Sequence, residues 1–453
     1  MERNLTLMTD LYQLTMMQGY FLHGEHEKLA VFDLFFRTNG EFNYVVAAGL
    51  ETAVEYITRL KFTDSDIEYL ASIGIFRKEF LAALKKFKFT GDVWAVEEGT
   101  LVFPSEPMLV IKAPIWQAQL IETALLNIIN HQSLIASKAS RIVNTAAPAA
   151  VLEFGLRRAQ GPDAGIYGAR SAVIAGCPST SNVFTGKEFG TKISGTHSHS
   201  WVLSFPSEID AFRAYAEIYP DNCLLLVDTY DALKHGVPNA ITVFKELRAL
   251  GHEPVGIRID SGDLAYLSKA ARKMLDDSGF TGAKICASND IDENIILHLK
   301  AQGARIDIYG VGTRLITSDN MPALGGVYKM SAVEEDGKLV PKMKISDSVE
   351  KTTNPGQKGL YRIYDRNHKA LADVITLFGE KLKKPLTLIH PTERWKTFTL
   401  EDYEARDLLV HVFHKGKLIY EQPALPEICG YHGKEMESFW DEYKRLITPH
   451  IYK

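Results

Sequence analysis

The sequence predicts an α/β protein built around an irregular (β/α) barrel, with a second domain formed by the two ends of the chain. Between residues 150 and 330, short apolar runs alternate with helical stretches, which is typical of a parallel sheet covered by helices. Many of these runs end in small clusters of Gly, Arg, Asp, Asn or His, and such sheets bind ligands at the C-terminal ends of their strands. Eight strand candidates within fewer than 200 residues favour a compact barrel. An open doubly wound sheet is the alternative, although no GxGxxG motif follows the first strand.

The composition is that of a soluble globular protein. A length of 453 residues favours two or three domains, and the charged and hydrophobic fractions of 24% and 46% are ordinary for this class. The formal net charge of −5 argues against broad nucleic-acid binding, which requires a basic surface. A small polyanionic substrate is compatible with this charge, because one pocket needs only a few Arg or Lys residues.

Several features predict a cytoplasmic enzyme. No apolar run approaches the roughly 18 residues needed to span a bilayer, so we expect no membrane contact. The N-terminus lacks the basic-then-apolar order of a signal peptide. The cysteines are scattered without CxxC spacing, which favours buried thiols in a reducing compartment over disulfides or zinc: Cys177, Cys223, Cys286 and Cys429.

The first 143 residues are predicted to mix helices with short strands. Segment 89–114 has alternating apolar residues punctuated by Gly and Pro, which favours an antiparallel sheet. Segment 115–143 has apolar residues at three- and four-residue spacing without Gly or Pro, which predicts a long helix. The other expected elements are a helix over 1–20 with Thr9 or Asp10 as N-cap, strands over 30–37 and 43–50, and a helix over 51–60.

The central region supplies the strands of the expected barrel. Their cores are predicted at residues 150–154, 172–176, 192–196, 223–228, 254–260, 284–288, 305–310 and 326–331. After about residue 335 the pattern changes, with strands and turns over 338–365 and a helix near 433–447. We therefore expect segments 1–114 and 336–453 to form one domain and segment 115–335 to form the catalytic one.

The string GTHSHSW (195–201) places two imidazoles, His197 and His199, two positions apart. On a strand they would face one side and could clamp a metal, whereas on a turn one could be a nucleophile and the other its neighbour. Two surface histidines in a loop are the plainer interpretation. Gly195 and Thr196 directly after an apolar run favour a functional role.

The string IRIDSGD (257–263) places Arg258 and Asp260 on one face of a strand end. A guanidinium fork beside a carboxylate suits a phosphate and a ribose diol together. Ser261 and Asp263 are explained equally well as N-caps of the following helix. The Arg–Asp pair is therefore the stronger candidate.

Glycines after a later strand predict a phosphate loop. In YGVGTRL (309–315), Gly310, Gly312 and Thr313 would allow close backbone approach, and amides at a helix start cradle a phosphate. Glycine in such loops is common, so this signal alone is weak. The same rim of the barrel would receive Ser288, Asn289, Asp290, Gly325 and Gly326.

Two further strand ends carry candidate side chains. Asp228, in LLVDTYD, could orient a histidine or bind Mg²⁺, and it could equally cap a helix. In EFGLRRAQG, Phe154 lies beside Arg157 and Arg158, an arrangement that suits a flat anionic ring. A solvated basic turn explains those arginines about as well.

Together these strings resemble the nicotinate phosphoribosyltransferase family, whose members join nicotinate to phosphoribosyl pyrophosphate with coupling to ATP. The order of the matching segments makes chance unlikely to produce them, and they cover most of the chain. They are TDLYQLTMMQGY (9–20), FFR (35–37), EFGLRRAQGPD (153–163), GTHSHSW (195–201), VDTYD (227–231), IRIDSGDL (257–264), ASNDIDE (287–293), YGVGT (309–313) and TNPGQK (353–358).

The resemblance implies a type II phosphoribosyltransferase fold, with an irregular α/β barrel and an α/β sandwich built from both termini. It implies a homodimer whose partner completes the site, and the formation of nicotinate mononucleotide and pyrophosphate in NAD biosynthesis. The ATP-phosphorylated histidine of the family falls on His199, oriented by Asp228, while His197 occupies a position that varies in the family. Mg²⁺ would neutralise the pyrophosphate, and few metal ligands from the protein are then required.

The resemblance also implies residues that bind the substrates. Phe154 and Arg157 would bind the pyridine ring, and Tyr12 of the partner subunit would stack on it. Arg258 and Asp260 would bind the ribose and the ring. The residues that would bind the 5-phosphate are Asn289, Gly310, Gly312 and Thr313.

Other functions stay open on the residues alone. A metal-dependent barrel hydrolase would use His197 and His199 with Asp228 or Asp260, but later strand ends offer no further histidine. Nicotinamide- or quinolinate-using transferases of the same fold and a non-catalytic nucleotide-binding homologue are the remaining alternatives.

Overall fold

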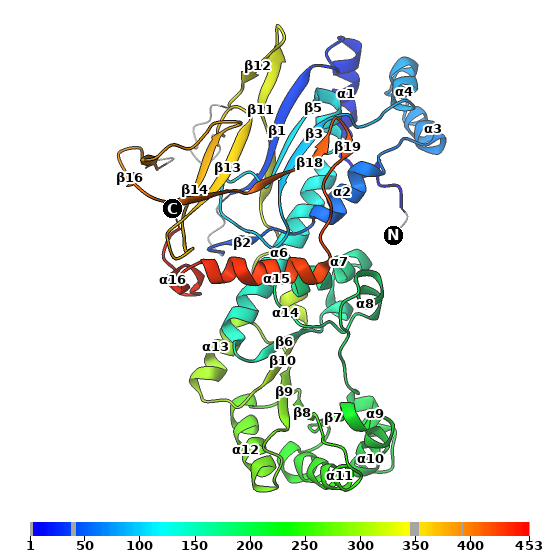
Figure 1. Ribbon diagram of the computed structural model, residues 1–453. Helices are drawn as coiled ribbons and strands as arrows, with labels where there is room; N and C mark the ends of the chain where they lie inside the picture. The colour runs from blue at the N-terminus through cyan, green and yellow to red at the C-terminus, as the bar shows by residue number, and fades with distance from the viewer. Residues whose placement is uncertain (1–2, 38–41, 345–352, 391–392, 453) are drawn as a thin grey trace. The chain divides into compact units, whose positions relative to one another are not determined.

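The computed structural model describes residues 3–37, 42–344, 353–390 and 393–452, and these form two compact units. The terminal unit consists of residues 1–137 and 323–453, and the central unit of residues 138–322 (Figure 1). The sequence-based boundaries at 114/115 and 335/336 lie elsewhere, because the long helix α6 (Glu122–Ala146) runs across the first division and strand β11 (Gly326–Glu335) belongs to the terminal unit.

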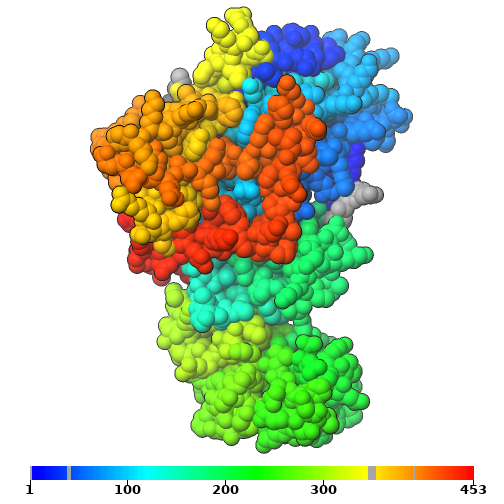
Figure 2. Space-filling view, in the orientation of Figure 1, coloured from blue at the N-terminus to red at the C-terminus, as the bar shows by residue number. Residues whose placement is uncertain are grey.

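A seven-stranded sheet forms the centre of the terminal unit, and its paired strands are antiparallel. Three strands from the N-terminal part of the chain form its middle, and strands from the C-terminal part flank them on both sides, so the termini fold together; Figure 2 shows the orange C-terminal segment against the cyan and blue N-terminal one. In sheet order the strands are β12 (Lys338–Pro341), β11, β1 (Leu29–Phe36), β5 (Leu109–Pro114), β3 (Asp92–Val96), β18 (Leu409–His414) and β19 (Lys417–Leu418).

Smaller sheets and helices complete the terminal unit. The sheets pair β2 (Val45–Val46) with β4 (Leu101–Val102), β15 (Leu386–Ile389) with β16 (Thr397–Leu400), and β13 (Lys358–Tyr364) with β14 (Ala370–Leu377) and β17 (Glu404–Asp407). The helices are α1 (Leu11–Leu22), α2 (Leu50–Thr58), α3 (Asp64–Ser72), α4 (Lys78–Leu84), α5 (Ile115–Leu120), the first part of α6, α15 (Leu425–Ser438) and α16 (Asp441–Lys444).

The central unit contains a five-stranded parallel sheet. Its order is β6 (Ala150–Glu153), β10 (Ile308–Val311), β9 (Lys284–Ser288), β8 (Gly256–Ile259) and β7 (Leu224–Leu226). Its longer helices are α7 (Pro162–Ile174), α8 (Val183–Phe189), α10 (Glu208–Ile218), α11 (Val237–Ala249), α12 (Leu264–Asp277) and α13 (Glu293–Ala301). Strands β7 to β10 lie in chain order and β6 pairs with β10, so the sheet advances in one direction instead of reversing as in a doubly wound fold.

The parallel sheet is buried because helices cover it. The three residues of β7 and Ile257, Ile259 and Ile285 are buried, as expected when a parallel strand has no solvent-facing side. Leu225 and these three isoleucines pack with Phe212 and Phe244 of the covering helices in one apolar core. This core fixes the strands, and their C-terminal ends carry the polar residues.

Six of the eight predicted strands are present, and five of them, β6 to β10, form the parallel sheet. The prediction of a strand over 172–176 is wrong: this apolar run ends helix α7, and an apolar run in a buried helix resembles one in a buried strand. The run 192–196 forms only an isolated bridge at Ile193, and 326–331 lies in β11 of the antiparallel sheet. Among the described residues no closed barrel forms, although bridges from Glu153 to Thr180 and on to Ile193 extend the sheet.

The remaining elements follow the predictions with shifted ends. Helix α1 begins at Leu11 with Asp10 as N-cap, and the predicted strand over 43–50 shrinks to two residues. The antiparallel pairing of β3 with β5 and the long helical region after Pro114 are confirmed, with a break at Ile121. Part of segment 338–365 lies outside the described residues. No described helix is long and apolar enough to cross a bilayer.

Candidate active site

The C-terminal ends of the five parallel strands bring polar residues from distant parts of the sequence together. All of these residues belong to the central unit, so the cluster is complete without reference to the terminal unit. They come from the segment before α9 (His199–Leu203), from its first residue and from the ends of β6 to β10. Loops that are far apart in the sequence therefore meet at one edge of the parallel sheet, as the sequence predicts.

Arg258 lies at the centre of this cluster. Its Nη2 donates to Asp260 Oδ1 at 2.9 Å, its Nε donates to Ser288 Oγ at 2.8 Å, and its Nη1 lies 3.4 Å from Thr196 Oγ1. Ser288 also donates to Asp260. Burial raises the pKa of Asp260, but the hydrogen bond from Ser288 and the charge of Arg258 outweigh it, so the pKa lies below its ordinary value. Asp260 is therefore a carboxylate at neutral pH.

Asp228 braces the backbone of the same loop. Its Oδ2 accepts from the amide of Asp260 at 2.8 Å and from Ser261 Oγ at 2.6 Å. The prediction that Asp228 orients His199 finds no support in these contacts, because the carboxylate is directed at residues 260 and 261. Its Oδ1 is buried and has no hydrogen-bond partner among the described residues.

His199 begins helix α9 and is positioned by two other side chains. Its Nδ1 lies 3.1 Å from Thr229 Oγ1, and its Nε2 lies 3.8 Å from Asp260 Oδ2. The imidazole is 40% exposed, so a substrate can reach it. Thr229 was not among the predicted site residues; it follows Asp228 directly, and its hydroxyl is the only feature of the sequence that points to this role.

His197 has a different environment from His199. It is buried, with the ring of Tyr215 at 4.8 Å, and its Nε2 accepts from the amide of Leu226 at 3.2 Å. Its Nδ1 lies 3.4 Å from Ser198 O. Burial lowers the pKa of His197 to about 4, so the ring is neutral. Both nitrogens face backbone groups, which leaves neither nitrogen open to a metal or a phosphoryl group.

Phe154 forms an apolar wall of the cluster. The guanidinium carbon of Arg258 lies 5.7 Å from the centre of its ring. A Cβ at Gly310 would come within 2.7 Å of this ring, so glycine is needed there to seat Phe154. The preceding residue, Glu153, is buried and accepts from Thr180 Oγ1 at 2.5 Å and from the amide of Gly155.

The other predicted phosphate-binding residues follow β9 and β10. Asn289 has a φ of 101°, a left-handed conformation that asparagine tolerates better than most residues. Gly312 precedes the short helix α14 (Thr313–Ile316), and a Cβ there would lie 3.1 Å from Phe154 O. Thr313 begins that helix. Gly310 and Gly312 lie against Phe154, and Asn289 directly follows Ser288 in the chain.

Two predicted substrate residues lie outside these contacts. Arg157 is an exposed residue of the short helix η1 (Leu156–Arg158) after β6. Tyr12 belongs to the terminal unit, on α1, and is 49% exposed. Burial and the neighbouring carboxylates Glu122 and Asp10 raise its pKa. The structure leaves both side chains accessible.

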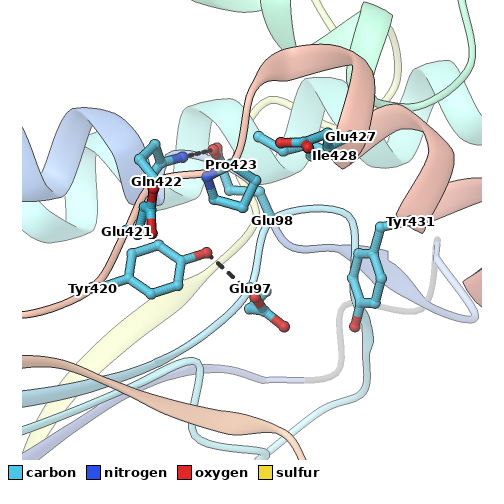
Figure 3. Close-up of a pocket in the computed structure, with 9 residues that line it drawn as sticks. All are labelled: Glu97, Glu98, Tyr420, Glu421, Gln422, Pro423, Glu427, Ile428 and Tyr431. Carbon is cyan, nitrogen blue, oxygen red and sulfur yellow. Dashed lines mark hydrogen bonds between the residues drawn. The ribbon is translucent and has the colours of Figure 1, made fainter.

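The terminal unit contains a cavity of about 460 Å³ that does not suit an anionic substrate (Figure 3). Tyr420 Oη donates to Glu97 at 3.3 Å, and Gln422 Nε2 lies 3.3 Å from Glu98. Its lining is Glu97, Glu98, Tyr420, Glu421, Gln422, Pro423, Glu427, Ile428 and Tyr431. Carboxylates repel phosphates and pyridine carboxylates, so we place the candidate site at the parallel sheet instead.

The rival interpretation of a metal hydrolase is not supported by the geometry. Within the described ranges, the one cluster of at least three possible metal-ligating residues is Asp92, His411 and His414 of the terminal unit. His197 and His199 do not converge with Asp228 or Asp260 into such a group. All four cysteines are thiols, and burial raises the pKa of Cys223 to about 12 and that of Cys286 to about 11.

Comparison with known proteins agrees with the geometry. Family models of the nicotinate phosphoribosyltransferase N-terminal and C-terminal domains match residues 7–130 and 357–453. The chain is 49% identical to nicotinate phosphoribosyltransferase of Bacillus subtilis over 100% of this chain and 92% of the relative. It is 32% identical to the human enzyme of that name over 99% of this chain and 94% of the relative.

Solved structures give the same answer. The crystal structure of human nicotinic acid phosphoribosyltransferase superposes with a TM-score of 0.86 at 30% identity, covering 98% of this chain and 96% of that one. A nicotinate-nucleotide pyrophosphorylase from Pyrococcus furiosus shares the fold, with a TM-score of 0.74 at 22% identity over 96% of both chains. The chain is therefore an enzyme that belongs to the nicotinate phosphoribosyltransferase family.

Proposed function

We propose that this enzyme forms nicotinate mononucleotide and pyrophosphate from nicotinate and phosphoribosyl pyrophosphate, coupled to ATP hydrolysis through phosphorylation of His199. The observation that carries the proposal is the cluster of Arg258, Asp260 and His199 beside the ring of Phe154. It combines a cation, a carboxylate, an accessible imidazole and an apolar wall. Those are the groups that a phosphorylated sugar and a flat ring require.

In the glycosyl transfer, the pyridine nitrogen attacks C1 of the ribose while the bond from C1 to the pyrophosphate oxygen breaks. Positive charge develops on the sugar, and negative charge on the departing pyrophosphate. Arg258 would interact with the phosphorylated sugar, and ionised Asp260 would bind its hydroxyls and stabilise the positive charge. Phe154 and Arg157 would hold the pyridine ring and its carboxylate, with Tyr12 of the partner subunit stacking on it in a homodimer.

The 5-phosphate would lie against the loops that follow β9 and β10. Asn289, Gly312 and Thr313 offer amide and hydroxyl donors there, while Gly310 serves by leaving room for Phe154. Asp228 Oδ1 has no hydrogen-bond partner among the described residues, so this carboxylate oxygen suits the hydrated Mg²⁺ that accompanies pyrophosphate. When bound, Mg²⁺ would neutralise the charge of the leaving group.

In the coupled step, the lone pair of His199 Nε2 would attack the γ-phosphorus of ATP, and ADP would leave. In the tautomer where Nδ1 donates to the Thr229 hydroxyl, Nε2 would carry the free lone pair. His197 could not replace His199, because its nitrogens face the backbone. Hydrolysis of the phosphohistidine would favour one conformational state of the site and drive the reaction forward.

The strand order supports a ring-like arrangement of the sheet around this site. Bridges at Thr180 and Ile193 extend the sheet beyond β6, and His197 accepts from the amide of Leu226 in β7. We infer that these segments complete the irregular barrel of a type II phosphoribosyltransferase, whose second domain is the α/β sandwich of the terminal unit, in a cytoplasmic enzyme.

The first experiment supplies purified protein with nicotinate, phosphoribosyl pyrophosphate, ATP and Mg²⁺ and measures pyrophosphate release. Release that nicotinamide and quinolinate do not support would establish the pyridine preference. Absence of release with all three pyridines would end the proposal.

The second experiment tests the histidine. His199→Asn should abolish ATP stimulation while slow ATP-independent transfer survives, and the exposed His235→Asn variant should behave as wild type. If His199→Asn retains full ATP stimulation, the phosphoryl acceptor has been misplaced.

A further inference from the structure

Three possible metal ligands gather on the seven-stranded sheet of the terminal unit, apart from the groups used in the proposed reaction. Asp92 lies at the start of β3, and His411 and His414 lie on β18. One ligand atom from each lies within 4.8 Å of those of the other two. His414 Nδ1 is 2.8 Å from Asp92 Oδ1, and His411 Nε2 is 3.4 Å from the same oxygen.

An irregularity in strand β18 makes this grouping possible. In a regular strand, residues three positions apart face opposite sides of the sheet, so His411 and His414 would be separated. Here His411 pairs with Trp94 and Phe413 pairs with Val93, which leaves one extra residue, Val412, between them. The bulge turns both histidines to the face that carries Asp92.

The surroundings of His411 indicate a missing ligand. Its ring stacks on Trp94 with centroids 4.6 Å apart and planes inclined by 10°. Its Nε2 is buried and makes no hydrogen bond, although it faces Asp92. His414 is 53% exposed, so an ion could enter from the solvent side. The ring of His411 is thus held with Nε2 directed at the shared carboxylate oxygen of Asp92 but without a hydrogen bond to it.

We propose that Asp92, His411 and His414 bind a divalent transition-metal ion, best represented by Zn²⁺. Two imidazoles and a carboxylate are borderline ligands that suit Zn²⁺ or Co²⁺ better than Mg²⁺ or Ca²⁺. Ligands at the usual zinc distances are about 3.4 Å apart in a tetrahedron, so rotations of the side chains bring these atoms into place. Lys112 lies opposite Asp92 and Lys417 opposite His414 in the strand register, and nearby positive charge would lower the affinity for a cation.

Such an ion would link the two ends of the chain. Asp92 comes from the N-terminal segment and both histidines from the C-terminal one, so the metal would tie β18 to β3 across their register. An ion that binds only the folded chain raises its stability in proportion to its occupancy. The site is therefore expected to be structural, with one or more positions left to water.

The test uses the full chain without an affinity tag, stripped with a chelator and titrated with Co²⁺. Co²⁺ gives visible absorption when bound to nitrogen ligands, and it should quench the fluorescence of Trp94, which stacks on His411. We expect saturation at one equivalent and displacement by Zn²⁺. The Trp94→Phe variant should keep the absorption and lose that quenching.

Variants decide between this site and any other. His414→Ala should weaken binding by more than the roughly 10–100-fold that loss of an outer-shell partner costs. The exposed His368→Ala, in the same unit, and His199→Asn, in the central unit, should keep wild-type binding. Equal Co²⁺ affinity in His414→Ala and wild type, or no binding at equimolar Co²⁺, would overturn the proposal.

Thermal unfolding shows whether a loss of metal binding in His414→Ala is caused by misfolding of the variant. His414 is exposed, so His414→Ala in chelator should unfold at the temperature of wild type in chelator. Added Zn²⁺ should raise the unfolding temperature of wild type and leave that of His414→Ala unchanged. A rise of equal size in both proteins would contradict the proposed site.

Discussion

Arginine meets carboxylates in both compact units, with different consequences. In the terminal unit, Arg362 is fully buried, donating to Asp373 at 2.5 Å and to Glu435 at 2.6 Å. In the central unit, Arg258 is 14% exposed and its partner Asp260 is 32% exposed. The first network has every charge matched by protein, whereas the second faces a surface that a ligand can occupy.

Burial therefore decides whether an arginine–carboxylate pair stabilises the fold or can bind a substrate. Two carboxylates hold Arg362, and burial opposes its charge while they raise its pKa well above the ordinary value. A closed network of this kind stabilises one arrangement, and its burial keeps a substrate from reaching the donors. Arg258 spreads its donors over one carboxylate and two hydroxyls, and a substrate phosphate can compete for them.

The largest expected effect is on stability, from Arg362→Ala. Removing the cation leaves Asp373 and Glu435 buried together, so the free energy of unfolding should fall by about 3–5 kcal/mol. Chemical denaturation followed by circular dichroism measures it. If Arg362→Ala unfolds at nearly the wild-type denaturant concentration, the network is not the structural element that its burial indicates.

The counterpart is Arg258→Ala in the central unit. Its hydrogen bonds to charged and polar partners contribute about 1–2 kcal/mol to unfolding, but kcat/KM for nicotinate should fall by about 100-fold or more. Denaturation and pyrophosphate release on the same preparation separate the two effects. Loss of stability without loss of activity would reverse the roles assigned to the two arginines.

The next largest expected effect is the pH dependence of the free energy of unfolding that His197 causes. Its folded pKa of about 4 lies below the ordinary 6.5, so the unfolded chain binds a proton more readily between these values. The stability from keeping His197 neutral is complete above pH 6.5 and is lost as pH falls towards 4, up to about 3 kcal/mol. His197→Gln should be less stable than wild type at neutral pH, and the difference should shrink on acidification. A constant difference would show that His197 does not titrate in this way.

The sequence was sufficient to predict what depends on local pattern. Alternating strands and helices predicted β6 to β10, and polar clusters after them predicted Arg258, Asp260 and His199 at one edge. The resemblance to a family then supplied the chemistry. These inferences succeed because strand C-termini of a parallel sheet must share an edge.

What failed depends on tertiary contacts. The apolar run at 172–176 belongs to a buried helix, and its hydrophobicity alone cannot distinguish that from a strand. Asp228 was expected beside His199, but Thr229 and Asp260 take that place, because the turn after β7 directs consecutive side chains to different partners. Nothing in the spacing of His197 and His199 shows that one is buried. The bulge at Val412 is likewise visible only in the strand register.

A smaller effect is expected from Gly310→Ala. The new Cβ would lie 2.7 Å from the ring of Phe154, so the ring must move, at a cost of about 1–3 kcal/mol in unfolding free energy. Because Phe154 flanks Arg258, KM for nicotinate should rise as well. Gly282→Ala, where no atom lies within 4 Å, is the matched control and should leave both quantities near wild type. Unchanged KM in Gly310→Ala would exclude Phe154 from the pyridine site.

The smallest expected effects come from two hydroxyls of the central unit, and they test whether burial alone, within one unit, changes the cost of losing a hydrogen bond. Thr180 and Ser261 each donate a hydroxyl to a carboxylate of the central unit, at 2.5 Å to buried Glu153 and 2.6 Å to partly buried Asp228. Thr180→Val should cost about 1–2 kcal/mol of unfolding free energy, because burial of Glu153 leaves no water to replace the donor.

For Ser261→Ala the expected cost is about 0.5 kcal/mol, since Ser261 is exposed and water can replace its hydroxyl. Parallel denaturation of both variants against wild type measures the pair. If the two costs are equal, then burial is not what separates closed networks from open ones, and the contrast between Arg362 and Arg258 needs another cause. If they differ as stated, the rule holds inside one unit as well as between the two.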